Sequence, residues 1–173
     1  MYIKQSKQLQ FRSLDFYPLN SYQENQISFI YSFFHDVYGY IQRQGVIEYI
    51  KNLNSMNDGM LEYELVNLVI DYKNNLIYLC ESYNDYHNKL TTPEIEILLD
   101  TENFLELCHI GFLKYVVMTK ENFIHIILSW DKIWKQKSIL YILLYQDDKD
   151  WYDVLPFQTQ EKMEQFITDH TKK

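Results

Sequence analysis

The chain of 173 residues is poor in glycine, proline and cysteine, with 4, 3 and 2 residues of these types. Because glycine and proline favour turns and linkers, their scarcity leaves little material for long irregular segments, and we expect a single domain. Cys80 and Cys108 lie far apart, and neither has a second cysteine nearby. This spacing argues against a disulfide framework and against a zinc site, so we expect two buried thiols.

The sequence also lacks an uncharged apolar run near the roughly 20 residues that a membrane span requires. Near the N-terminus, Lys4, Lys7 and Arg12 are not followed by the apolar segment of a secretory signal. We therefore expect a cytoplasmic protein that does not bind membranes.

Common catalytic motifs are missing too. There is no glycine-rich phosphate loop, no Gly-x-Ser-x-Gly, no His-Glu-x-x-His and no paired Cys-x-x-Cys. The histidines are scattered over different predicted elements, where each is more easily explained as a surface or core residue than as a base or ligand: His35, His87, His109, His125 and His170. We expect no enzyme activity, no cofactor and no metal.

Positive charge is in short supply, since 16 basic residues face 24 acidic ones, for a net charge of −8. Residues 58–106 hold 11 acidic and 2 basic residues, a local net charge of −9. Nucleic acid and anionic membranes would repel such a chain, whereas a basic protein would be attracted to it.

Hydrophobic periodicity predicts the elements. We expect an extended lead-in over residues 1–20 with a short strand near Leu9 to Leu14, and a helix over 22–53 with a possible break near Gly45. A polar loop over residues 54–59 and three strands over 63–99 should follow, the first two strands forming a hairpin around Asn74 and Asn75 and the third running from Glu94 to Leu99. Two helices over 101–137, the first ending at about Val117, a hairpin over 139–155, and a helix over 159–170 with Thr159 as its N-cap complete an α+β fold. We expect one mixed or antiparallel sheet of about five strands, packed with about four helices.

The stretch from Thr119 to Phe157 is the most strongly patterned. Thr119 is a good helix N-cap, and apolar residues follow it at helical spacing: Phe123, Ile126, Ile127, Trp130, Ile133 and Trp134. Residues 139–145 are so apolar that they predict an interior strand. Residues 151–155 should return antiparallel, and Pro156 should end the pairing.

Two pairs of carboxylates are spaced as on a strand face: Glu62 with Glu64, and Glu94 with Glu96. Residues i and i+2 of a strand share a face, so either pair could act as acid and base or hold a metal. A carboxylate-dependent enzyme is therefore an alternative hypothesis, although a solvated strand face explains the same pattern.

The predicted turn after residue 145 is unusually acidic, because four carboxylates and only Lys149 surround two aromatic residues. Like charges this close cost folding free energy unless a cationic partner answers them, and aromatic rings flanked by acids are frequent in protein interfaces. A soluble turn with the indole facing the core is the alternative. Glu81, Asp85 and Tyr86 form a second acidic and aromatic group. The predicted binding surface comprises Asp147, Asp148, Asp150, Trp151, Tyr152, Asp153, Glu81, Asp85 and Tyr86.

The same stretch resembles a known family. Thr-Lys-Glu-Asn-Phe-x-x-Ile-x-x-x-Trp over 119–130, a lysine-rich helix end, an Ile-Leu-Leu strand, Gln-Asp-Asp and Trp151 are similar to C-terminal parts of bacterial immunity proteins that accompany polymorphic toxins, including those of contact-dependent growth inhibition. The resemblance covers about residues 119–157. It implies a cytoplasmic protein that binds one cognate toxin domain, often a basic nuclease, and blocks it. A structural or regulatory module that oligomerises through an aromatic face is a further alternative.

Overall fold

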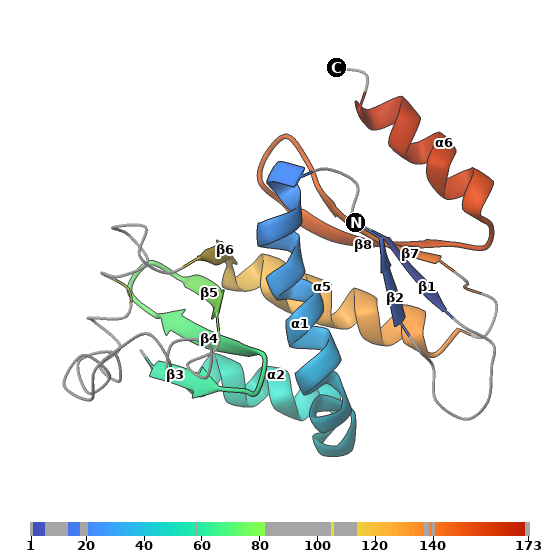
Figure 1. The fold of residues 1–173 in the computed structure, drawn as a ribbon. Coiled ribbons are helices and arrows are strands. Elements are labelled where there is room, and N and C mark those ends of the chain that lie inside the picture. The colour runs from blue at the N-terminus through green and yellow to red at the C-terminus, as the bar shows by residue number, and fades with distance from the viewer. Residues whose placement is uncertain are drawn as a thin grey trace. The chain divides into compact units, whose positions relative to one another are not determined.

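The computed structural model describes residues 2–5, 14–17, 21–57, 59–81, 105, 114–136, 139 and 141–171. These residues form an α+β fold with antiparallel strands, as the sequence predicts (Figure 1). By its internal contacts the chain divides into two compact units. We call Asn25–Phe123 the central unit, and Met1–Glu24 together with Ile124–Lys173 the terminal unit.

The helix predicted over 22–53 is present, and it is broken where expected. Helix α1 spans Ser21–Gln44, α2 spans Val46–Ser55, and Gly45 lies between them with φ of 96°. That backbone conformation is open to glycine and strained for other residues. Gly45 thus separates two helices that the apolar periodicity alone would have joined.

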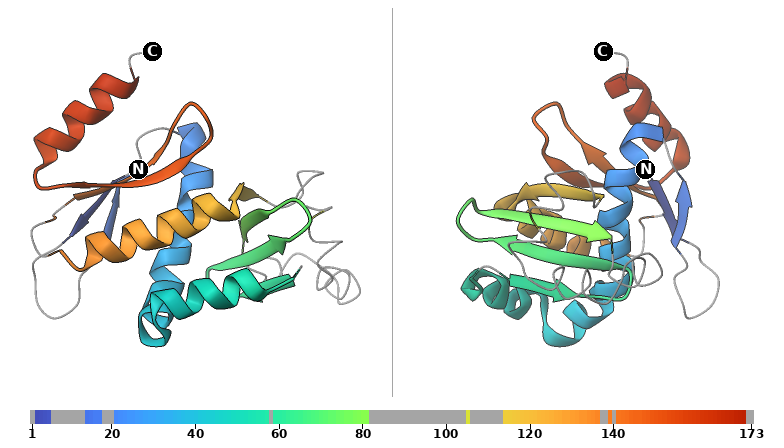
Figure 2. Two further views of the ribbon diagram at one scale, coloured as in Figure 1. Left: turned by 180° about the vertical axis from the view of Figure 1, so that it is seen from behind. Right: turned by 60° about the vertical axis from the view of Figure 1, so that its left-hand side comes forward.

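The central unit contains a four-stranded antiparallel sheet in the order β3-β4-β5-β6, and Figure 2 shows these strands side by side. Strand β3 is Gly59–Glu62, β4 Val66–Asp71, β5 Leu76–Glu81 and β6 Tyr115–Thr119. The predicted hairpin is confirmed as β4 and β5. At its turn Asn75 has φ of 56°, and the Asn74 N–H donates to Asp71 Oδ1 at 3.0 Å.

Two strands of this sheet were not predicted. Residues 54–59 were expected to be a loop, yet β3 begins at Gly59 and pairs with β4. The helix predicted through about Val117 is wrong at its end, because Tyr115–Thr119 is strand β6, in which burial alternates from residue to residue. The β-branched Val116 and Val117 favour that geometry. The strand predicted at Glu94 to Leu99 lies outside the described residues.

The aromatic packing of the central unit is organised around Phe33, which is fully buried. Its ring meets those of Phe34, Tyr63 and Phe123 at centroid distances of 5.5, 6.0 and 5.1 Å, each in an edge arrangement. Offset and edge contacts of this kind add to the stabilisation from apolar burial.

The terminal unit holds a second four-stranded sheet, in the order β2-β1-β7-β8 and antiparallel throughout. Strand β1 is Tyr2–Gln5, β2 Leu14–Tyr17, β7 Tyr141–Gln146 and β8 Tyr152–Phe157. The interior position predicted for the 139–145 run is confirmed, since β7 pairs with both β1 and β8. The extended lead-in contains a strand pair in place of one short strand, and residues 6–13 lie outside the described part.

Pro156 does not end the pairing of β8, because it lies opposite Ile142 within the strand and Phe157 continues opposite Tyr141. The expectation was wrong because β8 is the last strand of its sheet. Proline lacks an N–H, and an edge strand tolerates this where an interior strand would lose a ladder hydrogen bond.

Helix α5 spans Lys120–Trp134 and α6 spans Gln160–Thr171. Both predicted N-caps are confirmed, because Thr119 Oγ1 accepts the Asn122 N–H at 3.1 Å and Thr159 Oγ1 accepts the Lys162 N–H at 3.4 Å. On α6, Met163 is fully buried against Tyr141 and Leu143 of β7.

The prediction of one sheet is therefore corrected to two. Hairpins could be recognised locally, but β1 pairs with β7 across most of the sequence, and no local pattern encodes that pairing. Within the described residues, no helix combines the length and apolar character needed to cross a bilayer.

Candidate functional site

The β7–β8 hairpin ends in a tight turn whose backbone is closed by hydrogen bonds. The Asp147 N–H donates to the Trp151 carbonyl at 2.9 Å, and the Asp150 N–H donates to the Asp147 carbonyl at 3.3 Å. Asp150 has φ of 59°, in the left-handed region that aspartate tolerates better than most residues. The turn therefore has one defined shape.

Two of the acids hold this shape. Asp147 Oδ1 accepts the Lys149 N–H at 2.9 Å and the Trp151 N–H at 2.8 Å. Asp150 Oδ1 accepts the side-chain amide of Gln146 at 3.1 Å. Asp148 is exposed at the tip of the turn, and among the described residues no hydrogen bond or ion pair to its carboxylate is found.

A histidine on α5 meets the base of the turn. His125 Nε2 lies 3.0 Å from Asp153 Oδ1, and the imidazole lies against the Trp151 indole at a centroid distance of 5.4 Å. Both members of the His125–Asp153 pair are part-exposed. Trp151 is half-buried, so its indole is neither sealed in a core nor free in solvent. We call Asp147, Asp148, Asp150, Trp151, Asp153 and His125 the hairpin surface.

Tyr152, which was expected to contribute to the binding surface, points the other way. It is only 3% exposed. Burial raises the pKa of its hydroxyl to about 12, and the Asp150 carboxylate adds to the shift. Strand alternation explains the correction, because residues 151 and 153 share one face and residue 152 takes the opposite one.

The second predicted acidic group is only partly described. Glu81 is the last residue of β5 and pairs with Val66 in the central unit. Asp85 and Tyr86 lie outside the described residues.

The structure does not support the carboxylate pair Glu62 and Glu64 of the alternative enzyme hypothesis. Glu62 ends β3, whereas Glu64 lies in the turn before β4, and both are exposed. The expectation that they share a strand face is wrong for that reason, and Glu94 and Glu96 are not in the described part. Among the residues that are described, no three His, Cys, Asp or Glu side chains lie close enough to hold a metal.

Cys80 and His170 both have structural surroundings. Cys80 is buried in the central unit beside Val69 and Tyr78, as expected. His170 makes a 2.8 Å hydrogen bond with the Phe166 carbonyl through Nδ1, and its ring stacks on that of Phe166.

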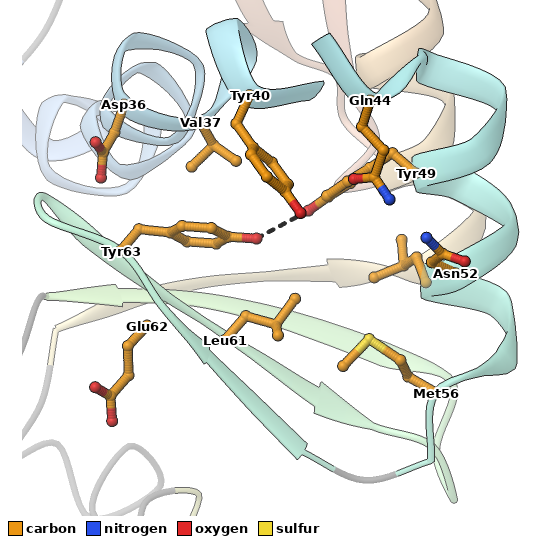
Figure 3. A pocket seen from close by; sticks show the side chains of 11 residues that line it. Asp36, Val37, Tyr40, Gln44, Tyr49, Asn52, Met56, Leu61, Glu62 and Tyr63 are labelled. Carbon is orange, nitrogen blue, oxygen red and sulfur yellow. Dashed lines mark hydrogen bonds between the residues drawn. The ribbon is translucent and has the colours of Figure 1, made fainter. Parts of the chain in front are cut away.

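Sequence reasoning missed a pocket of about 410 Å³ in the central unit, between the end of α1, α2 and β3 (Figure 3). The Tyr49 and Tyr63 hydroxyls lie 3.3 Å apart and form a hydrogen bond inside it. Tyr49 lies within the helix predicted over 22–53, whereas Tyr63 directly follows β3, a strand that was not predicted. The residues lining the pocket are Asp36, Val37, Tyr40, Gln44, Tyr49, Asn52, Leu53, Met56, Leu61, Glu62 and Tyr63.

The chain matches no protein-family model, no curated protein and no solved structure. Function is therefore inferred from the geometry and charge of the hairpin surface and of the pocket.

Proposed function

We propose that the protein is a non-catalytic immunity protein, which neutralises a basic toxin domain by binding it through the hairpin surface. The observation that carries the proposal is the closed turn, which contains an exposed carboxylate, that of Asp148, and a half-buried indole, that of Trp151. The resemblance of residues 119–157 to immunity proteins supports the same proposal. The protein would act in the cytoplasm, where such toxins meet their targets.

The charge of the turn supports a cationic partner. Asp147, Asp148, Asp150 and Asp153 lie within seven residues, and Lys149 is the one basic residue among them. The hydrogen bonds described for the carboxylates of Asp147, Asp150 and Asp153 all end on Oδ1. Because an ionised carboxylate can accept about four hydrogen bonds, each retains capacity for a lysine or arginine of a partner.

Rigidity supports a binding role as well. Association costs less when a surface already has its bound shape, and the turn is fixed by five hydrogen bonds before any partner arrives. Trp151 is held against His125, so its exposed edge is presented in a fixed orientation. Tryptophan in such a setting is a frequent interface anchor.

The test needs a candidate partner, which is a basic toxin domain sought at the C-terminus of a protein encoded next to this one. Binding is measured by isothermal titration for the wild type and for Asp148→Asn with Asp150→Asn at low and moderate salt. Asparagine keeps an oxygen for Gln146 and tolerates a positive φ, so the turn should persist. We expect the double variant to bind about 3- to 10-fold more weakly, and with a shallower salt dependence, from two lost charge pairs.

The matched control is Glu164→Gln with Asp169→Asn, which removes the same charge from exposed positions of α6 in the same unit. That control should bind like the wild type. If both double variants bind equally well and with the same salt dependence as the wild type, the hairpin surface is not the contact.

A further inference from the structure

The pocket in the central unit combines aromatic rings with an apolar floor. Tyr40 approaches it from α1, Tyr49 from α2 and Tyr63 from the position just after β3, and Figure 3 shows their hydroxyl groups turned toward one another. Val37, Leu53, Met56 and Leu61 are the apolar residues of the remaining lining. Its volume of about 410 Å³ is within the range of small-molecule sites.

Two of the three phenols, those of Tyr49 and Tyr63, form a hydrogen bond with each other. Burial raises the pKa of Tyr49, and it raises the pKa of Tyr63 against the opposing effect of their mutual hydrogen bond. Since one hydroxyl of the Tyr49–Tyr63 pair donates to the other, the acceptor keeps its own proton for a further partner. Tyr40 is 50% exposed, so part of its ring face is available for contact.

The charge of the lining has a single sign. Asp36 and Glu62 are the charged residues among the eleven that line the pocket. Figure 3 shows the Glu62 carboxylate turned away from Tyr63 and Leu61, while Asp36 lies beside Tyr63 at the rim. Asp36 Oδ2 accepts the Leu65 N–H at 3.0 Å, which fixes the carboxylate there. An anion would meet repulsion at this rim, and a cation would be attracted.

We propose that this pocket binds an organic cation, with an ammonium, guanidinium or amidinium group near Asp36 and its apolar body against the tyrosine rings. Electron-rich aromatic faces attract cations, and tyrosine cages are a known means of holding them. The apolar floor contributes by removing the body of the ligand from water. This proposal does not depend on the proposed toxin-binding surface, and it is tested by separate experiments.

Three isosteric probes test the charge preference directly: benzamidine, benzamide and benzoate, which are cationic, neutral and anionic. Each is titrated into isotopically labelled full-length protein, and amide shifts are followed by NMR. We expect benzamidine to bind most tightly, with shifts concentrated at residues 36–44, 49–56 and 61–63. Equal affinities, a preference for benzoate, shifts confined to other segments, or no binding at millimolar concentration would each overturn the proposal.

Variants then separate charge from shape. Asp36→Asn keeps an oxygen for the Leu65 N–H, and should weaken benzamidine about three- to fivefold while leaving benzamide unchanged. Tyr40→Leu should weaken the binding of benzamidine to the same extent, about three- to fivefold, whereas Tyr40→Phe, which retains the ring, should leave it unchanged. Tyr72→Leu is the control, because Tyr72 is also exposed but does not line the pocket. If Tyr40→Leu behaves like Tyr72→Leu, the ring is not a contact.

The cation could be a free metabolite or the side chain of another protein. Agmatine and a capped Gly-Arg-Gly peptide carry the same guanidinium group and separate these sources. Tighter binding of agmatine indicates a small-molecule ligand, and tighter binding of the peptide indicates an arginine from a partner. If agmatine, the peptide and benzamidine all fail to bind, the proposed cation site is refuted.

Discussion

Replacing Asp147 by alanine should loosen the acidic turn, because one carboxylate oxygen, Oδ1, accepts both the Lys149 and the Trp151 amide hydrogens. The second of these bonds is part-buried, so water replaces it less well. A hydrogen bond to a charged group contributes about 1.5–3 kcal/mol when protected and less when exposed, so we expect a total loss of about 1–3 kcal/mol. In a chain of this size, each kcal/mol lowers the melting temperature by about 2–4 °C.

The assay is urea unfolding followed by circular dichroism and by tryptophan fluorescence. Asp147→Asn retains a neutral oxygen at the same place and should lose less than half as much stability as Asp147→Ala. Asp148→Ala removes an equal charge from the exposed tip and should change stability by less than about 0.5 kcal/mol. If Asp147→Ala and Asp148→Ala have the same unfolding free energy, then the Oδ1 bonds do not hold the turn, and its described rigidity is wrong.

Gly45→Ala should lower the free energy of unfolding by about 1–2 kcal/mol, because φ of 96° strains an L residue although no atom lies within 4 Å of the new methyl group. Gly39→Ala, inside α1, should instead raise it by about 0.5–1 kcal/mol. Chemical denaturation of both variants shows whether the two changes have opposite signs. Phe33→Ala should cost about 3–5 kcal/mol by opening a cavity among its aromatic neighbours, and a loss near that of an exposed residue would contradict the packing. Tyr152 has a folded pKa of about 12 against about 10 unfolded, so its contribution to stability is complete below pH 10 and is lost as pH rises toward 12. In Tyr152→Phe the free energy of unfolding should fall less between pH 10 and pH 12 than in the wild type. If it falls equally in both proteins, Tyr152 does not titrate as described.

Local chemistry was sufficient to predict several elements. The N-caps at Thr119 and Thr159, the break at Gly45 and the β4–β5 hairpin all depend on residues within a few positions of one another. Side-chain hydroxyls and special backbone angles act at that range, so a single sequence carries the signal.

Pairings between distant segments could not be predicted. Strand β1 lies beside β7, and β6 completes the other sheet after a long intervening segment. The choice between one sheet and two depends on which distant edges meet, and hydrophobic periodicity does not specify that.

The candidate sites show the same division. The acidity of residues 147–153 was plain in the sequence, but strand alternation turns Tyr152 inward, and the role of Asp147 in fixing the turn depends on its hydrogen bonds. His125 joins the hairpin surface from α5, a contact across 28 positions of the chain. The pocket required α1, α2 and an unpredicted strand to come together, and so no spacing of tyrosines could have revealed it.

The most direct test of the proposed function is to locate the contact by NMR. A candidate basic toxin domain that binds the protein is added to isotopically labelled protein, and amide signals are compared before and after binding. We expect the largest changes at residues 147–153 and at His125 on α5. Binding that leaves these signals unmoved, with changes confined to other segments, would contradict the assignment of the hairpin surface.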